Sequence, residues 1–94
     1  MSKFEDVLQD SCFDYSKDGE VYLLSCYTPA GEDWEFYVTD EEDFKQYAEN
    51  FDPEEEFKMW VEARNVVSGV PDIPTLWKDQ LWKQEKLKEV ANAL

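Results

Sequence analysis

The pattern of apolar and polar positions in residues 12–39 predicts a small antiparallel sheet. Three segments, residues 12–15, 20–27 and 34–39, are rich in aromatic and branched side chains, and short turn-forming segments separate them. In the third segment apolar and polar residues alternate, which is typical of a strand with one covered face and one wetter face. The second segment is apolar on both faces from Val21 to Leu24. We therefore expect a three-stranded meander whose second strand is central.

Apolar residues at helical spacing predict one helix before this sheet and three helices after it. Ser2 and Glu5 have the pattern of a capping box, and the helix that they open should end near Asp10. Thr39 or Asp40 is expected to cap the second helix, because acidic residues in a first turn complement the positive end of the helix dipole.

The last two helices are marked by prolines near their starts. Asp52 is a favourable N-cap, and Pro53 then occupies the first helical position, where its missing amide hydrogen is harmless. A break at residues 68–71 precedes the final helix, which should start between residues 72 and 74 and run to the end of the chain. The helical residues expected to face the core are Phe4, Val7, Leu8, Phe44, Tyr47, Ala48, Phe51, Phe57, Trp60, Val61, Ile73, Trp77, Leu81, Leu87, Ala91 and Leu94.

These elements predict one α+β domain over residues 1–94. Its order is a short N-terminal helix, a three-stranded antiparallel meander, and three helices packed on the sheet. A chain of 94 residues buries only something over half of the surface that its unfolded form exposes. Its 15 aromatic side chains nevertheless supply a large apolar area, which argues against a disordered acidic tail.

The charge of the chain is strongly negative and unevenly distributed. The formal net charge is −14, from 23 carboxylates and 9 basic residues. Residues 40–62 hold ten of the carboxylates against two lysines, whereas residues 63–94 carry a net charge of +1. Such a field repels nucleic acid and attracts basic surfaces at long range. We therefore expect a basic partner and no direct binding of nucleic acid.

The sequence lacks the residues and motifs on which most enzymes depend. It contains no histidine, no glycine-rich phosphate loop, no nucleophile elbow and no Cys-x-x-Cys pair. Neighbouring carboxylates such as Glu41 and Glu42 diverge around a helix axis, so they do not converge on one metal ion. We predict a protein that is not an enzyme and that uses neither a cofactor nor a metal.

Apolar run lengths and cysteine usage indicate the compartment. No apolar run reaches the length of a membrane span, and the first residues do not resemble a secretion signal, so we expect a cytoplasmic protein without membrane contact. Cys12 and Cys26 could pair if they faced one another across strands. Two cysteines without a signal peptide are more often reduced core residues, and we assign them no chemistry.

Eight carboxylates at the starts of the second and third helices are the candidate partner-binding residues. Two interpretations of them stay open: they are helix caps and solvated surface, or they form a functional row. Duplex DNA carries one negative charge per roughly 1.7 Å of its axis, so a dense row of carboxylates on helix ends can approximate a track of phosphates. The residues are Asp40, Glu41, Glu42, Asp43, Asp52, Glu54, Glu55 and Glu56.

Trp82 is the one candidate binding residue on the final helix. It lies beside the apolar stripe through Trp77 and Leu81, so either it is partly buried or it is an exposed aromatic anchor for a partner. The lysines of this helix are expected on its solvated face, where they balance the negative half of the molecule. They are Lys78, Lys83, Lys86 and Lys88.

The carboxy-terminal half of the chain has a recognisable pattern. Residues 51–57 lead through residues 60–64 to Ser-Gly-Val-Pro at 68–71, and a long helix ends with Lys-Glu-Val-Ala-Asn-Ala-Leu at 88–94. This pattern resembles small acidic proteins of Firmicutes phages and mobile elements, a resemblance that assigns no functional residues. The predicted architecture also resembles that of small anti-CRISPR proteins that mimic DNA in the PAM-reading groove of an RNA-guided nuclease.

The leading hypothesis is therefore a non-enzymatic inhibitor from a phage or mobile element. It would present the eight carboxylates to the basic nucleic-acid-binding groove of a host defence protein, of the CRISPR or restriction type. The alternative is a general protein-interaction module whose acidic and aromatic surface serves in an assembly, without mimicry of nucleic acid.

Overall fold

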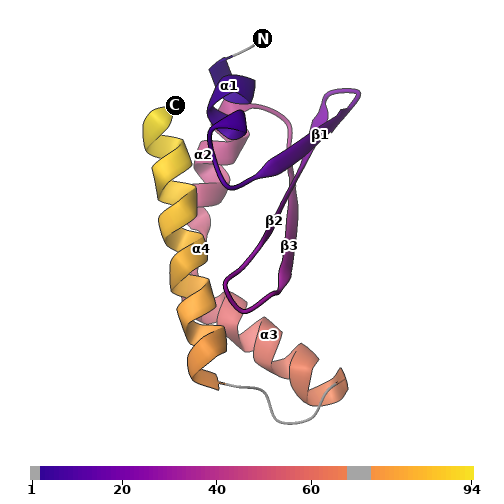
Figure 1. Ribbon diagram of the computed structural model, residues 1–94, viewed down its shortest axis with the longest axis vertical. Coiled ribbons are helices and arrows are strands. Elements are labelled where there is room, and N and C mark those ends of the chain that lie inside the picture. Colours follow the sequence, from indigo (N-terminus) through magenta and orange to yellow (C-terminus); the bar gives the residue numbers. More distant parts are fainter. Residues whose placement is uncertain (1–2, 68–72) are drawn as a thin grey trace.

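The computed structural model describes residues 3–67 and 73–94 (Figure 1). The predicted α+β class and order of elements are confirmed. Ser2, Asp72 and the predicted break at residues 68–71 lie outside the described residues, as does the side chain of Ile73. The elements are α1 (Lys3–Gln9), β1 (Asp14–Asp18), β2 (Val21–Tyr27), β3 (Asp33–Val38), α2 (Glu41–Asn50), α3 (Pro53–Val67) and α4 (Ile73–Ala93).

The sheet is an antiparallel meander in the order β1-β2-β3, so the predicted central position of β2 is confirmed. Leu24 on β2 lies opposite Tyr15 on β1 and Phe36 on β3. On β3 the alternation is as predicted, with Trp34, Phe36 and Val38 buried between exposed residues.

The first strand and its turn differ from the prediction. The strand starts at Asp14 and not at residue 12, because Ser11 holds the preceding segment in a turn: its hydroxyl donates to the Leu8 carbonyl and accepts from the Phe13 amide. It also continues to Asp18, so the turn to β2 is shorter than predicted. Gly19, with φ of 63°, supplies the left-handed backbone that this turn requires.

The core lies between one face of the sheet and helices α1, α2 and α4, which Figure 1 shows on the same side of the sheet. Phe13 is central to it, with ring centroids 5.2 Å from Trp34 and 5.6 Å from Phe36 in edge-to-face contacts. The buried apolar residues of this core are Phe4, Leu8, Phe13, Tyr22, Leu24, Cys26, Trp34, Phe36, Val38, Phe44, Ala48, Leu87 and Val90. The opposite face of the sheet carries the exposed side chains of β3 and the ends of β2.

The third helix is less buried than predicted. Phe57, Trp60 and Val61 are only partly buried, because α3 packs mainly on α4 and extends beyond the end of the sheet (Figure 1). The rings of Phe57 and Trp77 meet edge to face at 5.4 Å.

The predicted core stripe of α4 is partly wrong. Leu87 is buried as predicted, and Trp77, Ala91 and Leu94 are partly buried, but Leu81 is 43% exposed. The buried face instead follows the helical spacing of Leu76, Gln80, Lys83, Leu87 and Val90. Two of these residues, Gln80 and Lys83, are polar. A prediction that selects only apolar residues leaves them out and therefore places the buried face on the wrong side of the helix.

Candidate acidic interface

The start of α2 is a reciprocal cap built from two of the predicted carboxylates. Asp40 Oδ1 accepts a hydrogen bond of 2.8 Å from the Asp43 amide, as an N-cap does. Asp43 Oδ2 in turn accepts 2.9 Å from the Thr39 amide. Of the two residues predicted as the N-cap, Asp40 is the one observed. Thr39, predicted as the last residue of the third strand, lies after β3 and donates its amide hydrogen to Asp43.

The start of α3 is also capped by an aspartate. Asp52 Oδ1 accepts 3.0 Å from the Glu54 amide, which confirms Asp52 as the cap before Pro53. Glu54 and Glu55 are exposed in the first turn, and Glu56 is partly buried. Both acidic helix starts are thus positioned by their own capping hydrogen bonds.

Four of the eight predicted carboxylates line one shallow groove, which we call the acidic groove. Asp43 reaches it from the first turn of α2, and Asp52, Glu55 and Glu56 reach it from the start of α3. The groove has a volume of about 420 Å³ and is lined by Tyr37, Asp43, Gln46, Tyr47, Asn50, Phe51, Asp52, Glu55 and Glu56. Among the described residues that line it there is no lysine or arginine, and the nearest cation shown to act on one of its carboxylates is the buried Lys83, whose pKa the charge of Glu56 raises.

The aromatic lining of the acidic groove is held by the core below it. The Tyr47 ring stacks on Phe36, with centroids 4.3 Å apart and planes 6° from parallel. Burial raises the pKa of the Tyr47 hydroxyl, so this group stays neutral at physiological pH. Tyr37 reaches the groove from β3 and is 68% exposed. The groove therefore combines carboxylates with tyrosine surface.

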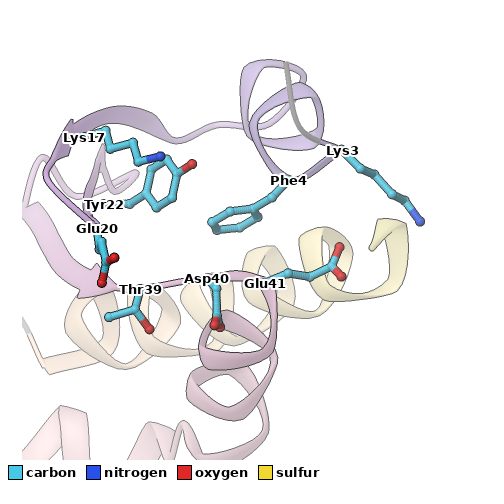
Figure 2. Close-up of a pocket in the computed structure, with 8 residues that line it drawn as sticks. All are labelled: Lys3, Phe4, Lys17, Glu20, Tyr22, Thr39, Asp40 and Glu41. Carbon is cyan, nitrogen blue, oxygen red and sulfur yellow. The ribbon is translucent and has the colours of Figure 1, made fainter.

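Asp40 and Glu41 belong to a different hollow, shown in Figure 2. This hollow has a volume of about 760 Å³ and also contains Lys3 and Lys17, so its charge is mixed. The Lys17 amine lies 5.2 Å from the centre of the Tyr22 ring. Glu42 and Glu54 line neither hollow, and Glu42 pairs with Lys45 at 3.8 Å. The structure thus divides the eight predicted residues between two sites and open surface.

Trp82 is partly buried against the core, which is the first of its two predicted roles. Its ring centroid lies 6.3 Å from that of Trp34, and the Lys86 amine lies 5.7 Å above it. Much of its surface is therefore covered within the chain.

Three charged residues lie deeper than the sequence predicts. Lys83 was expected on the solvated face of α4 and is instead fully buried, with its amine 4.6 Å from the centre of the Trp60 ring. Glu32, directly before β3, is also buried, and Asp79 on α4 is 2% exposed. Burial of these groups depends on contacts between distant segments, which no local pattern reveals.

Comparisons with known proteins do not indicate a family for this chain. The chain matches no protein-family model, and comparison with curated proteins and with solved structures gives no match.

Within residues 3–67 and 73–94, no helix is long and apolar enough to cross a membrane. In the same part of the chain, no group of three or more His, Cys, Asp or Glu side chains is arranged so that it could hold a metal ion.

Proposed function

We propose that this protein is a non-enzymatic inhibitor that binds a basic nucleic-acid-binding protein and competes with nucleic acid for its groove. The observation that carries the proposal is the acidic groove, in which four carboxylates from two helix starts surround a tyrosine-lined hollow without a basic residue. Such a hollow suits the arginine and lysine side chains with which proteins hold phosphates.

The chemistry of the groove favours arginine in particular. A guanidinium can donate two parallel hydrogen bonds to one carboxylate and can also lie on an aromatic face. Carboxylates and tyrosine rings meet in this groove, so both kinds of contact are available to one inserted side chain. The net charge of −14 would further speed the encounter with a basic partner.

The resemblance to acidic phage proteins directs the proposal toward a host defence protein of the CRISPR or restriction type. In such a protein the basic groove that holds DNA would be the binding site. The inhibitor would act by occupancy, with one inhibitor per groove and without chemical turnover.

A two-charge substitution within the acidic groove tests the proposal. The tagged protein would be incubated with a nuclease-treated bacterial lysate, and the bound proteins would be identified by mass spectrometry. We expect the wild type to capture a basic nucleic-acid-binding protein that added duplex DNA displaces. Glu55→Gln with Glu56→Gln should then weaken binding to that purified partner by about tenfold or more, because the inserted cations lose their carboxylates.

The matched control removes the same charge outside the groove. Glu42→Gln with Glu54→Gln also changes two glutamates in first helical turns, so it has the same effect on net charge and a similar effect on helix dipoles. This variant should bind within about threefold of the wild type, since rim and remote charges act mainly on the association rate. Equal losses for both variants, or no displacement by DNA, would contradict the proposal.

The exposed tyrosines favour the alternative of a general interaction module. Tyr27 is 74% exposed on the sheet face that the helices leave uncovered, and Tyr37, which also lines the acidic groove, is 68% exposed on the same face. Large exposed aromatic rings are typical of protein-binding surfaces. A captured partner that is not basic, and whose binding persists in the Glu55→Gln/Glu56→Gln variant, would support this alternative.

A further inference from the structure

The two cysteines meet although they are 14 residues apart in sequence. Cys12 lies in the turn between α1 and β1, and Cys26 lies on the central strand β2. Their sulfur atoms are 3.7 Å apart, and the Cys26 thiol donates a hydrogen bond to the Cys12 sulfur. A disulfide bond is about 2.05 Å long, so the sulfurs must approach by less than about 2 Å to form one.

The two thiols differ in their access to solvent. Cys12 is exposed and lines a hollow of about 340 Å³ together with Ser11 and Lys86. Cys26 is buried in the core, where it also contacts the Tyr27 carbonyl. A small reagent can therefore reach Cys12 directly, whereas Cys26 is reached only through Cys12.

From this geometry we propose that Cys12 and Cys26 form a thiol–disulfide exchange site that reacts with small disulfides of the glutathione class. Cys12 is the entry thiol and Cys26 is the resolving thiol. The product is an intramolecular disulfide between the α1–β1 turn and β2.

The reaction proceeds in two exchange steps. In the first, the Cys12 thiolate attacks one sulfur of the small disulfide, a mixed disulfide forms, and one small thiolate leaves. In the second, Cys26 loses its proton to solvent and attacks the Cys12 sulfur, which releases the second small thiolate. The two cysteines together lose two electrons and two protons, and the small disulfide gains them as two thiols.

The electrostatics of the pair support this order. Burial raises the pKa of the Cys12 thiol, while the hydrogen bond from Cys26 and the charge of Lys86 oppose that rise. Burial and then the neighbouring Cys12 raise the pKa of Cys26 to about 12. Cys12 therefore ionises first, with Cys26 as its hydrogen-bond donor. Because the thiolate is the nucleophile, exchange should become faster as the pH rises above neutrality.

The full chain treated with oxidised glutathione tests the proposal. Intact-mass spectrometry after alkylation should show that the wild type loses two hydrogens, takes up no alkylating reagent and stays monomeric. The new bond closes a short loop in the unfolded chain, so the oxidised protein should melt about 10 °C or more above the reduced one. A stable glutathione adduct, interchain dimers, an unreacted chain or an unchanged melting temperature would overturn the proposal.

Two single variants establish which sulfur reacts first. With Cys26→Ala, a single glutathione adduct should accumulate on Cys12, because nothing resolves it. With Cys12→Ser, Cys26 should stay unmodified over the same time, because it is buried. Circular dichroism confirms that each variant is folded. If glutathione adds to Cys26 in the Cys12→Ser variant as fast as it adds to Cys12 in the Cys26→Ala variant, the assigned roles are wrong.

Discussion

At the scale of single residues, Lys83 is the least expected feature of the fold. Its side chain is fully buried on α4, with the amine 4.6 Å from the Trp60 ring centre and 5.5 Å from that of Trp34. Among the described residues its amine has no hydrogen-bond partner, and burial lowers its pKa, although the charges of Glu56 and Asp79 partly oppose that shift. Two indole faces thus replace the water that normally solvates a lysine.

This burial predicts that Lys83→Met stabilises the protein. Methionine fills a similar volume without a charge to desolvate, so the free energy of unfolding at pH 7 should rise by about 1–2 kcal/mol. The folded-state pKa lies below the unfolded value near 10.5. Below the folded-state pKa the buried amine is charged, and its desolvation lowers the stability of the wild type in full. As the pH rises from that pKa toward 10.5, the folded protein loses this proton before the unfolded chain does, so the wild type becomes more stable. The advantage of the variant should shrink over that range.

Urea unfolding of the wild type and the variant between pH 7 and pH 10 measures this difference. Lys88→Met is the matched control, because Lys88 is exposed on the same helix, and it should change the stability by less than about 0.5 kcal/mol. A Lys83→Met variant that is less stable than the wild type at every pH would show that the contacts with the two tryptophans outweigh desolvation.

At the scale of elements, a buried carboxylate joins α4 to the turn between β2 and β3. Asp79 Oδ2 accepts a hydrogen bond of 2.6 Å from the Thr28 hydroxyl, and Oδ1 accepts 3.3 Å from the Ala30 amide. The Thr28 hydroxyl in turn accepts from the Glu32 amide at 3.1 Å. One side chain thereby fixes a four-residue turn against a helix 49 to 51 residues away in sequence.

Removal of this carboxylate should destabilise the fold. Asp79→Ala leaves a buried hydroxyl and a backbone amide without their acceptor, and we expect a loss of about 2–4 kcal/mol in the free energy of unfolding. Asp79→Asn keeps one acceptor oxygen and should lose less. Chemical denaturation gives both values, and hydrogen exchange at Ala30 reports whether the turn opens locally. A loss below about 0.5 kcal/mol for the alanine variant would show that the turn holds without α4.

The sequence predicts the elements better than their contacts, and the reason is physical. Caps such as Asp40 and Asp52 act within one helical turn, so their residue types identify them. The buried face of α4 contains Gln80 and Lys83, which become buried only because α3 and the sheet close over them. The eight candidate carboxylates likewise follow from the sequence alone, as the acidic residues at two helix starts. Which four of them line one groove depends on how α2 and α3 are arranged in space, and no local pattern shows that.

At the scale of the whole molecule, the net charge of −14 is confined to a body with extents of 44 × 25 × 20 Å. At 0.01 M ionic strength the Debye length is about 30 Å, so most carboxylates repel one another across the fold. At 1 M the Debye length falls to about 3 Å, and that repulsion is screened. The fold should therefore be limited in stability by self-repulsion at low salt.

This repulsion predicts that salt stabilises the protein. The melting temperature should rise by several degrees between 0.01 M and 1 M NaCl, with most of the change below about 0.15 M, where the Debye length shortens fastest. Glu35→Gln with Glu49→Gln removes two exposed charges away from the acidic groove, and Glu49 also lies in the last turn of α2, where a negative charge opposes the helix dipole. This double variant should melt above the wild type at 0.01 M and converge with it at 1 M. If the melting temperature of the wild type stays constant or falls as salt is added, the carboxylates are already compensated within the fold. Self-repulsion would then not limit the stability.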